Sequence, residues 1–106
     1  MAPEAVTRIT QSLFAQVAAG AAASPRQRKN HNLHQESDLV QRFLNVLQPG
    51  TYVRPHRHRR EQAGAGFECF VVLQGRIGLL VLNSAGEVLQ RERLEASGEV
   101  RGVQLA

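Results

Sequence analysis

The sequence has 106 residues, of which 42% are hydrophobic and 21% are charged. This composition is typical of one globular domain, and it excludes both a disordered chain and two folds side by side. A single cysteine excludes an internal disulfide framework, and no apolar run is long enough to span a membrane. We therefore expect a cytoplasmic protein without disulfides and without membrane contact.

The charge balance favours an anionic partner. Lys and Arg number 13 against 9 Asp and Glu, a net charge of +4, and every cation except Lys29 is an arginine. Arginine suits bidentate recognition of carboxylate and phosphate groups. Aromatic residues make up only 5% of the chain and tryptophan is absent. Few side chains can therefore stack on bases, and a nucleic-acid partner is not expected.

Residues 1–23 are predicted to form a short amphipathic helix. Pro3 suits the first turn of a helix, and Gly20 is a plausible end point. Apolar residues recur at three- and four-residue spacing, which places them on one helix face: Val6, Ile9, Leu13 and Val17. Polar residues interrupt this segment, so it is not expected to be a cleaved secretory signal.

The rest of the chain reads as a polar arm followed by strands. Residues 24–38 are polar and show no periodicity, which predicts a loop or extended arm. Beyond them, segments rich in β-formers alternate with turn signals such as Gln48-Pro49-Gly50. The expected strands lie within residues 40–47, 67–73, 77–82, 88–94 and 100–106. Short strands with short glycine-containing turns predict an all-β antiparallel sandwich or barrel over residues 39–106.

One group of residues has the spacing of a metal site. His56 and His58 lie two positions apart, so in extended backbone both imidazoles project from one face. Glu68, on the next expected strand, would complete a set of two histidines and one carboxylate. A solvated basic loop among arginines is the alternative interpretation of the two histidines.

The surrounding residues resemble a known motif. Gly50-x5-His56-x-His58 followed by Glu68-x6-Gly75 has the order of the first cupin motif. The nine residues between His58 and Glu68 exceed the usual spacing, and we expect them to form a longer hairpin loop outside the strands.

At a finer level, the chain resembles the small WbuC-type cupin metalloproteins from about residue 24 onward. The matching segments, of which residues 52–58 are the most specific, are Ser24-Pro25-Arg26, Asn32-Leu33-His34, Val40-Gln41-Arg42, residues 47–58 and residues 68–80.

The resemblance implies a single RmlC-like jelly-roll domain over residues 1–106, with a short N-terminal helix. It implies a divalent metal held by His56, His58 and Glu68, with zinc, manganese, iron and nickel not distinguished. It also implies a second motif, Pro-x-Gly-x-x-His, with a fourth ligand shortly after residue 105. Because the sequence ends at Ala106, we expect that ligand and the last strands to be absent, and the open edge to favour a homodimer.

Strand alternation assigns roles to neighbouring residues. If the two histidines face inward, Tyr52 and Arg54 do so too. Arg54 then becomes a candidate for holding an anionic ligand, with Tyr52 as a hydrogen-bonding partner; a plain ion pair is an equally good reading of Arg54. The resemblance suggests that His34 lies near the pocket mouth as a proton-transfer candidate, with an exposed loop histidine as the alternative.

The same alternation sorts the expected strand at residues 67–73. Phe70 and Val72 share the inward face with Glu68, whereas Cys69 faces outward. We expect Cys69 to be a small packed hydrophobe rather than a ligand or a reactive thiol.

The resulting expectation is a metal-dependent cupin acting on an anionic, carbohydrate-derived small molecule, the link to bacterial surface polysaccharides resting on the resemblance alone. Isomerisation, epimerisation and dioxygenation are all compatible with such a site. The alternative is a non-catalytic module that binds a metal or ligand without turnover. A third, less favoured hypothesis is a nucleic-acid-binding domain that uses Arg57, Arg59 and Arg60 on phosphates.

Overall fold

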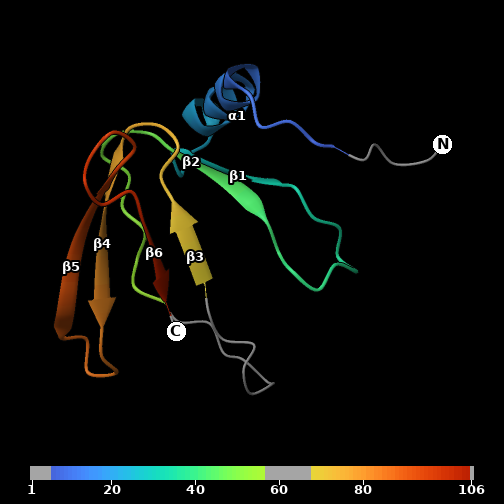
Figure 1. Ribbon diagram of the computed structural model, residues 1–106. Coiled ribbons are helices and arrows are strands. Elements are labelled where there is room, and N and C mark those ends of the chain that lie inside the picture. Colours follow the sequence, from blue (N-terminus) through green and yellow to red (C-terminus); the bar gives the residue numbers. More distant parts are fainter. Residues whose placement is uncertain (1–5, 57–67, 106) are drawn as a thin grey trace. The chain divides into compact units, whose positions relative to one another are not determined.

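The computed structural model describes residues 6–56 and 68–105. The chain divides into two compact units, Met1–Val53 and Arg54–Ala106. The described elements are one helix and six strands, and every strand pair is antiparallel (Figure 1). This confirms a β-rich fold with antiparallel pairing. No helix in these residues has the length and hydrophobicity that crossing a membrane requires.

Helix α1, Gln11–Ala23, begins the first unit. Thr10 is its N-cap, because the Thr10 hydroxyl accepts a hydrogen bond from the Leu13 backbone N–H at 3.1 Å. The predicted start near Pro3 is therefore wrong for the described residues: Val6 and Ile9 precede the helix and are 69% and 49% exposed.

The predicted end of the helix at Gly20 is also wrong, because α1 continues to Ala23. At its C-terminal end, the Gln27 side-chain amide donates to the carbonyls of Ala22 and Ser24, at 3.0 and 2.8 Å. These two bonds satisfy carbonyls that a helix end otherwise leaves unpaired. Gln27 adopts a left-handed conformation with φ of 56° as the chain leaves the helix.

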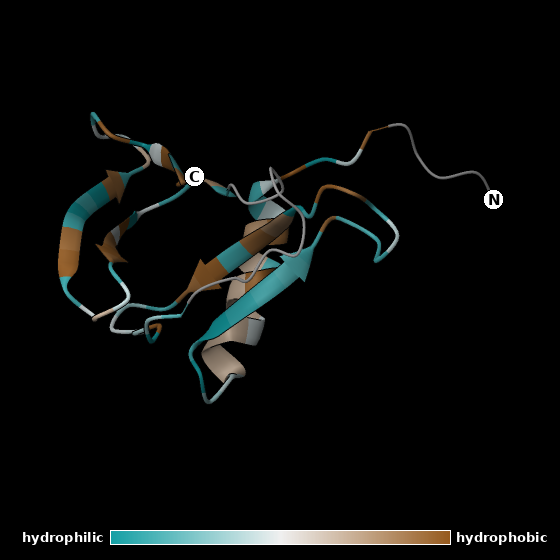
Figure 2. Ribbon diagram, turned by 90° about the horizontal axis from the view of Figure 1, so that it is seen from below, coloured by the Kyte–Doolittle hydropathy of each residue, from teal (hydrophilic) through white to brown (hydrophobic). Residues whose placement is uncertain are grey.

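Strands β1 (Arg28–Asn32) and β2 (Phe43–Leu47) pair in register from Arg28 opposite Leu47 to Asn32 opposite Phe43. Helix α1 packs on both strands through its apolar face, with Val17 and Ala21 buried. Figure 2 shows the contrast between the hydrophilic β1 and the largely hydrophobic β2. Strand β1 lies inside the segment predicted as an arm without periodicity.

The turn at residues 48–50 follows its prediction. The Thr51 N–H donates to the Gln48 carbonyl at 3.1 Å, and Gly50 has φ of 85°. A Pro-Gly pair at the two central positions is the sequence signature of a type II turn, because only the second position needs a positive φ. Residues 51–56, which follow this turn, form no strand.

In the second unit, β4 (Arg76–Leu82) and β5 (Val88–Glu95) form a hairpin with a bulge at Val81/Leu82. Leu94 is 1% exposed and is the largest fully buried side chain among the described residues. The predicted turn at residues 83–86 is confirmed, since the Gly86 N–H donates to the Asn83 carbonyl at 3.0 Å.

Strand β3, Glu68–Val71, pairs with β6, Gly102–Leu105. Gly102 lies opposite Val71, and a Cβ at Gly102 would collide with the backbone carbonyl oxygen of Phe70 and lie 3.1 Å from the Val71 Cα. The close approach of the two backbones therefore requires glycine at this position.

Candidate functional site

The three predicted metal ligands are described only in part. His56 is exposed at the end of residues 51–56, and Glu68 is half-buried at the start of β3, opposite Leu105. His58 lies outside the described residues, as do Arg57, Arg59 and Arg60. Over the described ranges, no group of three or more His, Cys, Asp or Glu side chains converges as a metal site.

The hydrogen bond of His56 defines its tautomer. The Nδ1 atom lies 3.1 Å from the carbonyl oxygen of Arg54. A carbonyl only accepts hydrogen bonds, so Nδ1 carries the proton and donates it. In the neutral ring the lone pair then lies on Nε2, the nitrogen that would coordinate a metal. Metal-bound histidines commonly donate their other ring N–H to a backbone carbonyl in this way.

The donor types of the two predicted ligands that the structure describes, His56 and Glu68, fit a divalent metal. Imidazole nitrogen and carboxylate oxygen are ligands common to zinc, iron, nickel and manganese sites. Arg54 is the residue whose role the sequence analysis missed, because its backbone carbonyl orients the His56 ring. A two-residue spacing between a carbonyl and an imidazole gives no distinctive sequence signal.

Tyr52 and Arg54 do not show the inward alternation expected of a strand. Tyr52 is 69% exposed, and Arg54 and His56 are exposed as well. The reason is local: residues 51–56 form no strand pairing, and Pro55 has no N–H to donate to one.

Strand β3 does show the predicted alternation. Glu68 and Phe70 are half-buried, whereas Cys69 and Val71 are exposed. Cys69 therefore faces outward as expected. The prediction that it packs as a small hydrophobe is wrong, because the thiol side of the strand is uncovered in the described residues.

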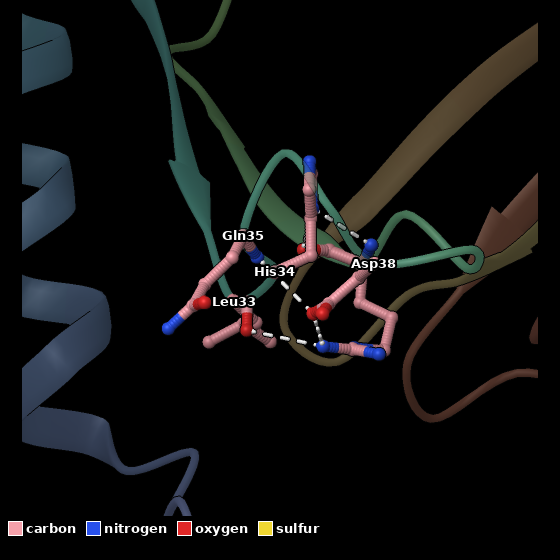
Figure 3. A network of polar contacts seen from close by, with 5 residues as sticks. Leu33, His34, Gln35 and Asp38 are labelled. Atoms are coloured by element: carbon pink, nitrogen blue, oxygen red, sulfur yellow. Dashed lines mark hydrogen bonds and ion pairs between the residues drawn. The ribbon is translucent and has the colours of Figure 1, made fainter. Parts of the chain in front are cut away.

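His34 is part of a polar network that closes the loop between β1 and β2 (Figure 3). It is half-buried within that loop. Its Nδ1 lies 3.0 Å from the Arg42 N–H nitrogen and 2.8 Å from the Arg42 carbonyl oxygen. That carbonyl already accepts the Leu33 N–H at 2.8 Å. Because the Arg42 N–H can only donate, Nδ1 accepts from it, and the neutral ring then carries its proton on Nε2.

Asp38 anchors the other side of the same loop. Its Oδ2 accepts the Gln35 N–H at 3.1 Å and pairs with the Arg42 guanidinium at 2.8 Å. The hydrogen bond from the Gln35 backbone, followed by that from Arg42, lowers the pKa of the Asp38 carboxyl below its usual 3.8. The loop is thus held closed by a carboxylate that stays ionised at neutral pH.

The structure adds one feature that the sequence analysis did not single out. A cavity of about 260 Å³ lies beside the end of α1 and the start of β1, lined by Ser24, Arg26, Arg28, Lys29 and Asn30. Three cations within four consecutive positions were the available signal. From the sequence alone, without knowledge that β1 pairs with β2, residues 26–29 indicate only a solvated arm.

The comparisons with known proteins place the chain in a family. Neither the curated proteins nor the solved structures that were compared with the chain gave a significant match. The profile of one family, described as a domain of unknown function (DUF6016), matches residues 9–94, which include helix α1, strands β1 to β4 and nearly all of β5. The chain belongs to the DUF6016 family.

Proposed function

We propose that this chain is a small metal-binding protein of the WbuC-type cupin class, acting in the cytoplasm on an anionic, carbohydrate-derived molecule. His56, His58 and Glu68 hold a divalent metal in this proposal. The link to bacterial surface-polysaccharide metabolism rests on the sequence resemblance described above. Because one fold can serve many functions, the proposal is carried by the ligand residues.

The observation that carries the proposal is the hydrogen bond from His56 Nδ1–H to the Arg54 carbonyl. It selects the tautomer with a lone pair on Nε2, and it limits rotation of an otherwise exposed ring. A histidine in a merely solvated basic loop has no need of this orientation.

The fold supports the proposal at a coarser level. Three antiparallel strand pairs in the described residues agree with a jelly roll, the antiparallel barrel that we propose. Glu68 opens β3 on the same face as Phe70, so an apolar side chain lies beside the carboxylate on that face. Apolar surroundings strengthen the attraction between a carboxylate and a metal ion.

A divalent metal in this site would supply Lewis-acid chemistry for isomerisation or epimerisation, and a redox-active metal such as iron would instead supply the oxygen activation that dioxygenation requires. The backbone carbonyl of Arg54 orients the His56 ring, and the side chain of the same residue is exposed. Its guanidinium can therefore bind an anionic group of a substrate close to that ring. Tyr52 offers a phenolic hydroxyl two residues before Arg54 in the sequence.

We also propose a homodimer. Each sheet in the described residues has two strands, so each strand has an edge without a backbone partner. Such edges favour association with a second chain. Sedimentation equilibrium of the purified chain tests this, and a monomer at all micromolar concentrations would contradict it.

The metal site is tested by elemental analysis of the protein purified without chelators. We expect close to one divalent metal per chain, lost in the double variant His56→Ala/His58→Ala. The matched control is His31→Ala, which removes a histidine from β1 and should retain the metal. A folded wild-type chain that contains no metal and binds no added zinc, manganese, iron or nickel would overturn the proposal.

A second measurement separates an enzyme-like site from a non-catalytic module. After replacement of the metal with cobalt(II), the visible spectrum reports the coordination sphere. A spectral change on addition of a sugar phosphate indicates an open coordination position, as a catalytic site requires. An unchanged spectrum, with the metal bound, supports the non-catalytic alternative.

A further inference from the structure

The cavity between the end of α1 and the start of β1 has the chemistry of an anion site. Its volume is about 260 Å³, and three of its five lining residues are cations: Arg26, Arg28 and Lys29. All five lining residues belong to the unit Met1–Val53, whereas the proposed metal ligands belong to Arg54–Ala106. The cavity and the proposed metal ligands therefore belong to different units of the chain.

Among the residues that the structure describes, the three cations have no carboxylate partner. In residues 6–56 and 68–105, the ion pairs join Arg42 to Asp38 and Arg93 to Glu95, and none involves the cavity lining. Like charges around one cavity repel each other and oppose the compact state. A bound anion would relieve that repulsion.

Capping of the helix does not account for these cations. Basic side chains near a helix C-terminus often bond the last carbonyls and interact with the helix dipole. Here the Gln27 amide bonds the carbonyls of Ala22 and Ser24. The guanidinium groups of Arg26 and Arg28 make no such bonds in the described structure, so their donors remain available.

The remaining lining residues add neutral donors. Ser24 Oγ accepts the Arg26 backbone N–H at 3.2 Å, which leaves the hydroxyl proton to donate elsewhere. The Asn30 side chain provides an amide. The Lys29 side chain lies against Gly20, where a Cβ would come within 2.8 Å of Nζ, so the helix limits where this ammonium can go.

We propose that this cavity binds a small molecule through a phosphate or diphosphate group. The lining residues Arg26, Arg28, Lys29 and Ser24 are of the types that bind the several oxygens of such a group. The volume lies below the roughly 300–1,000 Å³ typical of sites for larger ligands. A cavity without aromatic lining favours a compact anion over single-stranded nucleic acid, which relies on stacking platforms.

The test uses the full chain and inorganic pyrophosphate. Calorimetric titration gives the Kd, and ¹⁵N–¹H NMR locates the bound anion. The variant Arg26→Gln/Arg28→Gln removes two lining cations. The matched control Arg76→Gln/Arg91→Gln removes two exposed arginines from the β4–β5 hairpin, so the net charge of the two variants is the same.

We expect pyrophosphate to shift the amide resonances of residues 24–30 and to bind at least tenfold more weakly to Arg26→Gln/Arg28→Gln, since charge-assisted hydrogen bonds are lost. The control variant should bind within about twofold of wild type, because exposed charges at long range are screened by salt. Equal weakening in both variants, no binding to wild type, or resonance shifts only outside residues 24–30 would each overturn the proposal. Tighter, strongly salt-dependent binding of a random oligonucleotide to the same residues would also overturn it, in favour of a nucleic-acid site.

Discussion

Leu94 offers the sharpest test of how the β4–β5 hairpin is stabilised. It is 1% exposed, whereas Leu80, in the same hairpin, is 53% exposed. Leu94→Ala removes buried methyl groups and leaves a cavity, which costs about 2–5 kcal/mol in the free energy of unfolding. Leu80→Ala is the matched control, and its half-exposed side chain should contribute only about 0.5–1 kcal/mol.

The expected loss of unfolding free energy in Leu94→Ala is large for a chain of this size. Stability of roughly 0.05–0.15 kcal/mol per residue gives a small domain only about 5–15 kcal/mol in total. Among the described residues, only Val17, Ala21 and Leu94 are buried hydrophobics. We therefore expect Leu94→Ala to lower the urea midpoint, followed by far-UV circular dichroism, much further than Leu80→Ala does. Free energies within about 0.5 kcal/mol of each other for the two variants, inside the usual scatter for surface substitutions, would refute the assignment of Leu94 to the core.

Two further predictions concern backbone and charge. Gly102→Ala should disrupt the pairing of β3 with β6, because the new Cβ meets the Phe70 carbonyl, whereas Gly78→Ala has open space and should be tolerated; equal thermal midpoints for the two variants would contradict this. Asp38→Asn should destabilise the chain at neutral pH by removing the ion pair with Arg42. Because the pKa of Asp38 is lowered on folding, its contribution is full above the usual 3.8 and disappears as the pH falls through the native-state pKa. Urea midpoints of wild type and Asp38→Asn should therefore begin to converge as the pH falls below 3.8, and a difference that does not shrink as the pH is lowered further would contradict the role of the carboxylate.

Local signals were the reliable part of the sequence analysis. The turn containing Pro49 and Gly50 and the turn ending at Gly86 both form as predicted, since each depends on a positive φ that glycine adopts without strain. The alternation of Glu68 and Cys69 in β3 also follows from the two-residue period of a strand. Strand ends differ from their predictions by a few residues, as for β2, which starts at Phe43.

The errors arose where distant residues decide the structure. Gly20 does not end the helix: α1 continues to Ala23, and Gln27, which lies beyond the helix, bonds the carbonyls at its end. Cys69 is exposed although a small sulfur side chain is usually buried, because β3 has no covering element on that face in the described residues. The hydrophobicity of the Cys69 side chain does not predict whether another element of the fold covers it.

For the candidate metal site, the sequence supplied the ligand types and their order, and the structure supplied the orientation of one ring. His56 could be proposed from its spacing to His58, but the carbonyl that selects its tautomer is visible only in three dimensions. The Asp38–Arg42 pair was equally hidden, because an i,i+4 pair outside a helix has no regular geometry.

The sequence by itself determined the turns, the alternation within β3 and the antiparallel character of the fold, because these depend on the steric and hydrogen-bonding preferences of a few adjacent residues. Only the tertiary structure decided that the polar run Arg28–Asn32 is a strand and that the cations before and within it surround a cavity. The physical reason is that this strand has no apolar period of its own. It forms because its backbone pairs with β2 and because α1 packs against both strands.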